Sequence, residues 1–134
     1  MTARTPAAVS NDRIAAAFML AHIVLQLSSG LLGAAIFMGL GGLMSVLGAA
    51  EEAFELVAFG GVFGGLGALL GIFLLAQAIP AAIAAWGLWR GSSWRQVAAI
   101  VASIMAITYV PVGTAFAIGT LYFVYQSHKA DRAG

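Results

Sequence analysis

Cysteine is absent from this 134-residue sequence, and charged residues are scarce. Without cysteine the chain can form neither a disulfide bond nor a thiolate metal site. Its six basic and five acidic residues cannot cover the surface of a water-soluble domain of this size. The net charge of +1 does not supply the basic face that a nucleic-acid-binding protein needs. These shortages argue against a soluble domain and against a nucleic-acid partner.

Recognisable catalytic patterns are absent as well. The sequence contains no Gly-x-Gly-x-x-Gly, Walker A, His-Glu-x-x-His or Gly-x-Ser-x-Gly motif. It also places no pair of carboxylates inside a predicted membrane span. We therefore expect a protein that is not an enzyme.

Apolar residues make up 62% of the chain, and the longest apolar run extends from Leu31 to Leu75. The acidic segment 51–55 interrupts that run once, so it reads as two helical arms joined at a tip. The first helix is expected to start before this run, and a shorter pair of helices is expected after it. A bilayer-spanning helix needs about 20 apolar residues. The sequence predicts an all-α, four-helix transmembrane bundle, with a long glycine-rich first hairpin and a shorter second one.

The expected helices run from Ile14 to at least Phe37, from after Glu55 to Arg90, from Trp94 to Val110 and from Ala115 to Ser127. Ser10 or Asn11 would cap the first helix, whose apolar run continues to Ala50. Residues 1–12 form a polar N-terminal tail, 13–128 a single four-span domain and 129–134 a C-terminal tail. A cleaved signal peptide is disfavoured because the first apolar run is too long for one.

Charge asymmetry predicts the topology. All six basic residues fall on one side of a four-crossing arrangement, whereas the acidic segment falls on the other. By the positive-inside rule, both termini are cytoplasmic. Aromatic and basic residues near the cytoplasmic boundary are typical interface anchors, namely Trp86, Trp89, Arg90, Trp94, Arg95, Tyr122 and Tyr125.

The first hairpin is longer than two crossings need. Residues 38–65 exceed the length required and are still apolar. Three arrangements fit: strongly tilted arms, re-entrant broken helices, or a hairpin that projects and is covered by other chains. The excess is more than a tilt of about 20° absorbs, which favours a projecting or re-entrant hairpin.

Glycines recur at helical spacing along this hairpin. Small residues three and four positions apart let helix backbones approach closely in lipid. The second arm carries three such pairs, and we predict a helix-packing interface at Gly60, Gly61, Gly64, Gly65, Gly67 and Gly71. The pattern does not distinguish packing within one chain from packing between chains.

A polar layer is predicted in the cytoplasmic half of the bundle. His22 and Gln26 share a helical face, and counting residues from the basic ends places other polar groups at similar depth. The layer comprises His22, Gln26, Gln77, Ser103 and Thr120. His22 is the strongest candidate, because ionisable groups inside membranes are usually functional. It would handle protons, ligate a haem or chlorophyll-type pigment, or simply be satisfied by polar groups on neighbouring helices.

The acidic tip comprises Glu51, Glu52 and Glu55. Glu52 and Glu55 are three residues apart and would be able to hold a cation together, but a solvated tip is the favoured interpretation. Glutamates at the start of the second arm also suit the positive end of its helix dipole. No metal site is predicted.

The second half of the chain resembles a set of small four-helix bacterial membrane proteins without assigned function. The matching positions are Gly87, Arg90, Trp94, Arg95, Pro111, Val112, Gly113, Thr114, Ala115, Ile118 and Leu121. The resemblance covers roughly residues 64–125 and departs at Ala117, where glycine is usual, and at Gly119, where an aromatic is usual. It implies a four-helix fold in the bacterial inner membrane and carries no activity or cofactor with it.

Taken together, these features favour a non-enzymatic membrane protein that self-assembles or serves as an accessory subunit of a larger complex. Its expected partners are the lipid bilayer and other copies of itself or another membrane protein. A small channel or transporter built around His22 is one alternative. A pigment- or haem-binding subunit with His22 as ligand is another.

Overall fold

The structure is a computed structural model that describes residues 6–109 and 111–133. It is all-helical in that part of the chain, with four helices: α1 (Pro6–Ala50), α2 (Phe54–Arg90), α3 (Arg95–Ile107) and α4 (Val112–Ala133). The helices form two compact units. Unit 1 contains Met1–Leu25 and Gln77–Gly134, and unit 2 contains Gln26–Ala76. The prediction of an all-α, four-helix fold is confirmed.

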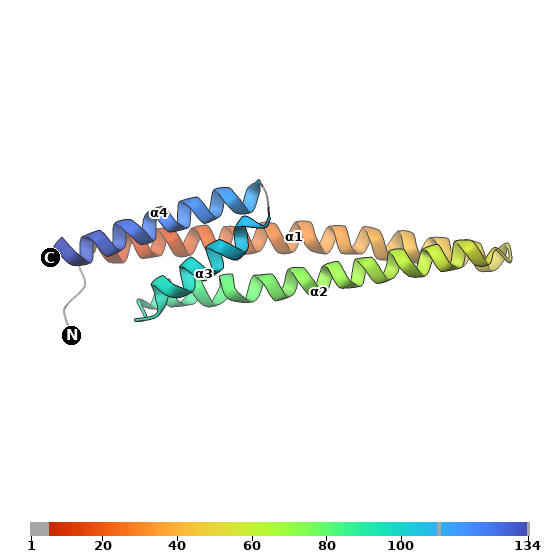
Figure 1. Ribbon diagram of the computed structural model, residues 1–134, viewed down its shortest axis with the longest axis horizontal. Helices are drawn as coiled ribbons and strands as arrows, with labels where there is room; N and C mark the ends of the chain where they lie inside the picture. The colour runs from red at the N-terminus through yellow and green to blue at the C-terminus, as the bar shows by residue number, and fades with distance from the viewer. Residues whose placement is uncertain (1–5, 110, 134) are drawn as a thin grey trace. The chain divides into compact units, whose positions relative to one another are not determined.

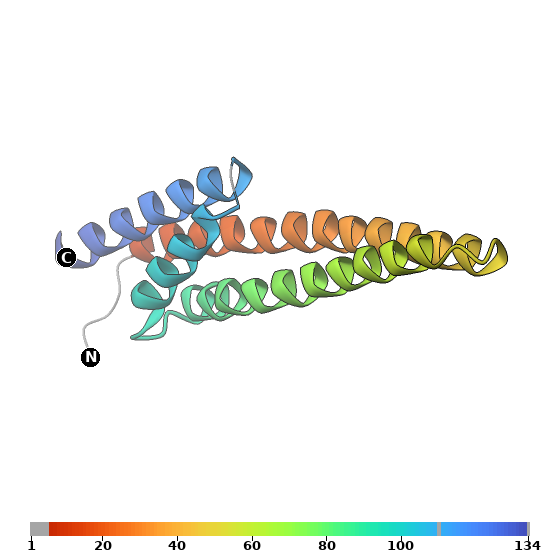
Figure 2. The same ribbon diagram turned by 45° about the vertical axis from the view of Figure 1, so that its right-hand side comes forward.

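Unit 2 is an antiparallel hairpin made from the second part of α1 and the first part of α2. Figures 1 and 2 show the two helices running side by side to the turn that joins them. Ala34, Gly41 and Gly48 are buried on α1, and Gly60, Gly67 and Leu74 are buried on α2. Each of the two sets repeats every seven residues, which is the spacing that keeps one seam of a helix facing its partner.

Unit 1 contains the four remaining helical segments, and α4 lies beside the first part of α1 in both views (Figures 1 and 2). Its apolar core is built largely from alanine. One cluster consists of Ala15, Ala16, Leu88, Ala99 and Val124, and a second of Met19, Ala81, Ala84, Ala85 and Ala102. Small side chains in the core let helix backbones pack closely.

Each long helix ends with a residue in the left-handed conformation. Gly91 has φ 69°, and the bonds from Ser92 N–H to the Gly87 carbonyl and from Gly91 N–H to the Leu88 carbonyl terminate α2. This is the Schellman motif, in which glycine is favoured because it has no Cβ. At the end of α1 the corresponding position is Glu52, with φ 55°.

The helix boundaries correct several predictions. α1 begins at Pro6, not near Ile14, and proline suits this first position because its missing N–H would have no helical partner. α3 ends earlier than predicted, at Ile107, and α4 continues through the predicted C-terminal tail to Ala133. Within the predicted tails, residues 1–5 and Gly134 lie outside the described residues, as does Val110 at the predicted end of the third helix.

Contacts in the fold explain why both tails are helical. Ala8 and Asp12 are buried, and Ser127 Oγ donates a hydrogen bond of 3.2 Å to the Ala8 carbonyl. The N-terminal tail is therefore ordered by packing against α4, which a count of polar residues along the sequence does not reveal. Tertiary contacts of this kind routinely override local propensity.

Two helices, α1 with 45 residues and α2 with 37, are long and apolar enough to cross a membrane. α3 has 13 residues, which corresponds to about 20 Å at 1.5 Å per residue. Proline 80 lies inside α2 and cannot donate a bond to the Ala76 carbonyl one turn earlier. That missing bond falls where unit 2 ends.

Candidate functional site

A buried ion network joins three helices of unit 1. Arg95 Nε lies 2.8 Å from Asp12 Oδ2, and Arg95 Nη2 lies 2.9 Å from Asp131 Oδ2. Arg95 also donates to the Ser92 carbonyl at 3.1 Å. The side chain of Asp12 is 1% exposed, that of Arg95 11% and that of Asp131 24%. The guanidinium, a planar fork of donors, is thereby divided between two carboxylates.

The same end of unit 1 carries two further polar contacts. Gln96 Nε2 lies 3.3 Å from His128 Nδ1, linking α3 to α4, and Ser127 bonds to the Ala8 carbonyl of α1. The sequence pattern indicated Arg95 only as an interface anchor and predicted no role for either aspartate. A signal was available, because Asp12, Arg95 and Asp131 all lie near helix ends that the topology places together.

The interior of unit 1 also holds three polar side chains from the predicted layer. His22 is 2% exposed, and Ser103 and Thr120 are fully buried. Among the described residues, His22 Nδ1, Ser103 Oγ and Thr120 Oγ1 have no hydrogen-bond partner. The His22 ring instead lies against two aromatic rings, with centroids 6.2 Å from Tyr109 and 5.8 Å from Phe116. Buried polar groups without partners are uncommon and mark this region as the candidate site.

The two glutamines of the predicted layer lie elsewhere. Gln26 is buried in unit 2, where its Nε2 lies 3.5 Å from the Leu74 carbonyl. Gln77 is in unit 1 and donates to Thr108 Oγ1 at 3.3 Å, beyond the end of α3. Thr108 lies five residues past Ser103, or about 7.5 Å along a helix. Gln77 lies 13 residues before Arg90 and Thr108 lies 13 residues after Arg95, whereas Ser103 lies only eight residues after Arg95. Gln77 therefore pairs at the depth of Thr108 and not at that of Ser103.

The glycines of unit 2 divide into two groups. A Cβ added at Gly41 would lie 2.5 Å from the Gly60 carbonyl oxygen and from the Gly64 nitrogen. One added at Gly67 would lie 2.9 Å from the Ala34 carbonyl oxygen and from Met38 Cγ. Real Cβ atoms do not approach other atoms this closely, so these positions admit glycine alone unless the helices separate. Gly60 and Gly67 thus pack within the chain.

In the second group, the position that an added Cβ would take is open. Added Cβ atoms at Gly39 and Gly42 of α1, and at Gly61, Gly64 and Gly65 of α2, would meet nothing within 4 Å among the described residues. Gly71 is in ordinary contact, with Ala34 Cβ at 3.7 Å. Three of the predicted packing glycines, Gly61, Gly64 and Gly65, therefore have room for a side chain. Gly41, which does need to be glycine, was not among the predicted positions.

The acidic tip forms the turn between α1 and α2. Glu51 and Glu52 are exposed in the turn, and Glu55 lies in the first turn of α2, where it complements the helix dipole. Ala53 N–H donates to the Gly48 carbonyl at 2.8 Å and closes the turn. Within the described residues, no three His, Asp or Glu side chains gather as a metal site.

The predicted interface anchors are exposed, apart from Arg95. The Arg13 guanidinium lies 6.0 Å from the Trp89 ring centroid, and that of Arg90 lies 4.2 Å from the Trp86 ring centroid. Both are cation–π contacts, which keep a charge at the edge of an aromatic surface. The remaining anchors, Trp94, Tyr122 and Tyr125, are also exposed on unit 1.

Two glycines of unit 1 leave room for aromatic rings. A Cβ at Gly87 would lie 2.5 Å from Trp94 Cζ3, so glycine there leaves room for the indole ring. At Gly119 an added Cβ would lie 2.6 Å from Phe18 Cε1. The ring of Phe18 occupies that space in this chain. Comparison with protein-family models, with curated proteins and with solved structures finds no match to this chain.

Proposed function

We propose that this chain is a non-enzymatic, multi-pass membrane protein that assembles with another copy of itself through its long glycine-rich hairpin. Membrane placement is supported by the surface. Large apolar side chains are exposed on all four helices of both units, among them Leu32, Leu69, Val97 and Ile118. Exposed apolar surface on this scale is compatible with lipid and incompatible with water.

The proposed topology has four crossings, with both termini in the cytoplasm of a bacterial cell. Its support is the ion network and the cation–π contact in unit 1. Asp12 and Arg13 of α1 contact Arg95 at the start of α3 and Trp89 near the end of α2. These helix ends therefore belong on one side, together with the basic residues. At about 20 Å, α3 crosses if the bilayer thins locally or its flanking turns lie in the interface.

Cysteine labelling tests the topology, because the chain has no cysteine of its own. Ser92→Cys lies in the α2–α3 turn and Ala53→Cys lies at the acidic tip. In intact cells, an impermeant reagent added from outside is expected to label position 53 and not position 92. Labelling of position 53 only after the cell membrane is opened would overturn the topology.

Self-assembly is carried by one observation, the open glycine face of α2. Added Cβ atoms at Gly61, Gly64 and Gly65 would meet nothing within 4 Å among the described residues, although the Gly64 backbone borders Gly41 of α1. The exposed side chain of Ile72 continues this face of the helix. Lipid does not drive helix association, so packing of small residues at close range is the main source of affinity between helices in membranes. An uncovered glycine face supplies that geometry to a second copy.

Crosslinking and native mass spectrometry of the mildly extracted protein test the assembly. Wild-type protein is expected to associate, and Gly61→Leu and Gly64→Leu are expected to weaken association at least tenfold by preventing close approach. Val62→Phe adds comparable bulk at an exposed position outside the glycine face and serves as control. Leu74 is unsuitable for that purpose, because it is buried against Gly30. A monomeric wild type, or undiminished association in both leucine variants, would refute the proposal.

A second candidate is a small channel or transporter. Its support is the set of buried polar atoms without partners on His22, Ser103 and Thr120. Proton flux into liposomes, compared between wild type and His22→Phe, tests it. An absorbance spectrum of the same preparation tests the alternative in which His22 ligates a haem or chlorophyll-type pigment.

A further inference from the structure

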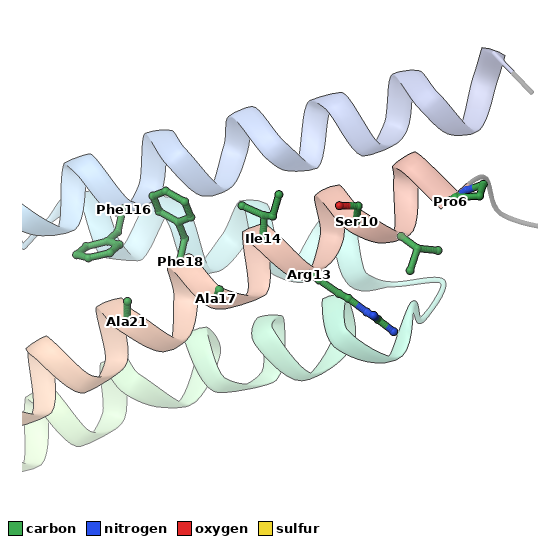
Figure 3. Close-up of a pocket in the computed structure, with 9 residues that line it drawn as sticks. Pro6, Ser10, Arg13, Ile14, Ala17, Phe18, Ala21 and Phe116 are labelled. Atoms are coloured by element: carbon green, nitrogen blue, oxygen red, sulfur yellow. The ribbon is translucent and has the colours of Figure 1, made fainter.

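A surface groove runs along the first part of α1 in unit 1. Its volume is about 820 Å³, and it is lined mainly by apolar side chains of α1, with Phe116 of α4 at one end (Figure 3). The lining begins at Pro6 and extends to Ala21, four turns of one helix. Grooves of this size are typical of small-molecule sites in proteins.

The wall of the groove is held in place by aromatic packing. Phe18 and Phe116 point toward one another in Figure 3, and their ring centroids are 6.0 Å apart. Phe18 also lies against Phe123 and against Gly119, which has no side chain to displace it. The small side chains of Ala17 and Ala21 leave the adjacent surface hollow. The wall is therefore apolar and fixed by packing.

One positive charge lies in this apolar lining. Arg13 is exposed, and Ser10 lies one helical turn before it on the same groove. Among the described residues no carboxylate lines the groove, since the neighbouring Asp12 is buried and paired with Arg95. The Trp89 ring, 6.0 Å from the guanidinium, is of the residue type that settles at the boundary between headgroups and acyl chains. The groove thus combines a cation and a hydroxyl with a purely apolar extension.

We propose that this groove binds one anionic phospholipid of the cytoplasmic leaflet, with Arg13 and Ser10 at its phosphate and one acyl chain along Ile14, Ala17, Phe18 and Ala21. The inference rests on the membrane placement and topology proposed above. From Arg13 to Ala21 is eight residues, or about 12 Å along the helix. That distance fits within one leaflet, about half of the roughly 30 Å hydrocarbon core. A non-helical protein segment would find no polar group on the apolar wall to pair with its backbone, whereas an acyl chain has no polar group to satisfy.

Native mass spectrometry of the full chain tests the site, with phosphatidylglycerol and phosphatidylcholine of identical acyl chains added in mild detergent. Wild type is expected to retain phosphatidylglycerol about fivefold better, the effect of about one basic residue on an anionic lipid. Arg13→Gln should abolish the preference, and Ala17→Phe, which fills the groove, should lower retention of both lipids. Arg90→Gln removes an arginine that stacks on Trp86 outside the groove and should change neither quantity.

Inorganic phosphate in excess separates the lipid from a free anion. If it fails to displace the bound lipid, the acyl chain contributes as proposed. Full displacement, equal retention of the two lipids by wild type, or unchanged retention in Ala17→Phe would each overturn the site. Circular dichroism checks that the variants keep wild-type helicity. Lipid retention is measured in detergent and does not depend on the labelling or crosslinking results. The lipid site can therefore be refuted while the proposed topology and self-assembly hold.

Discussion

Arg95 Nε lies 2.8 Å from Asp12 Oδ2, and this buried ion pair connects the start of α1 with the start of α3. Removing one partner of an isolated buried pair costs roughly 3–5 kcal/mol, and here Asp131 still compensates part of the Arg95 charge when Asp12 is replaced. Asp12→Asn is therefore expected to lower the free energy of unfolding by about 3 kcal/mol, measured by denaturant titration in detergent with tryptophan fluorescence. Asp131→Asn should cost less, because that side chain is more exposed.

A double-mutant cycle controls this prediction. If Asp12 and Arg95 interact directly, Asp12→Asn combined with Arg95→Gln should cost less than the sum of the two single changes. Strictly additive losses would show that the pair contributes nothing to stability.

Two fully buried serines of unit 1 offer a matched comparison. Ser127 Oγ donates to the Ala8 carbonyl, whereas Ser103 Oγ has no partner among the described residues. Ser127→Ala is expected to lower stability by about 1 kcal/mol, the usual net value of a hydrogen bond, and Ser103→Ala should be neutral or stabilising. Thermal unfolding followed by circular dichroism measures both. A larger loss for Ser103→Ala than for Ser127→Ala would contradict the assignment.

Adjacent glycines on α1 should respond in opposite ways to alanine. At Gly41 the new methyl group would meet the backbone of α2 at 2.5 Å, so Gly41→Ala must separate the helices and should cost about 1–3 kcal/mol. At Gly42 the same change enters open space, and alanine's better helix propensity should make Gly42→Ala neutral or stabilising by up to about 1 kcal/mol. If the two substitutions changed the free energy of unfolding equally, Gly41 would not be the glycine that packs against α2.

Glu52 adopts φ 55°, a conformation that costs a residue with a side chain roughly 1–2 kcal/mol. Glu52→Gly is expected to recover about 1 kcal/mol of stability by removing the strain at this helix end. Glu51→Gly, at a position without positive φ, is the control and should bring no gain. Denaturant titration of both variants decides the matter, and a destabilised Glu52→Gly protein would show that the carboxylate has another structural role.

The helices themselves were readable from the sequence because helix formation depends on local composition and on breaks in it. The acidic segment 51–55 and the polar residues around Gly91 stand between long apolar runs, and the structure has its turns there. The ends of the chain were misjudged. Asp12 and Asp131 look like polar tail residues until Arg95, distant in sequence, is placed between them.

The glycine pattern shows most clearly where prediction from the sequence ended. The Gly60–Gly64 and Gly61–Gly65 pairs have the same four-residue spacing on neighbouring faces of α2, so spacing alone cannot tell which face is covered. The sequence by itself determined an all-helical, apolar chain with an acidic turn. Only the tertiary structure decided that Gly60 meets α1 while Gly61 stays open, because that choice depends on the register between two helices.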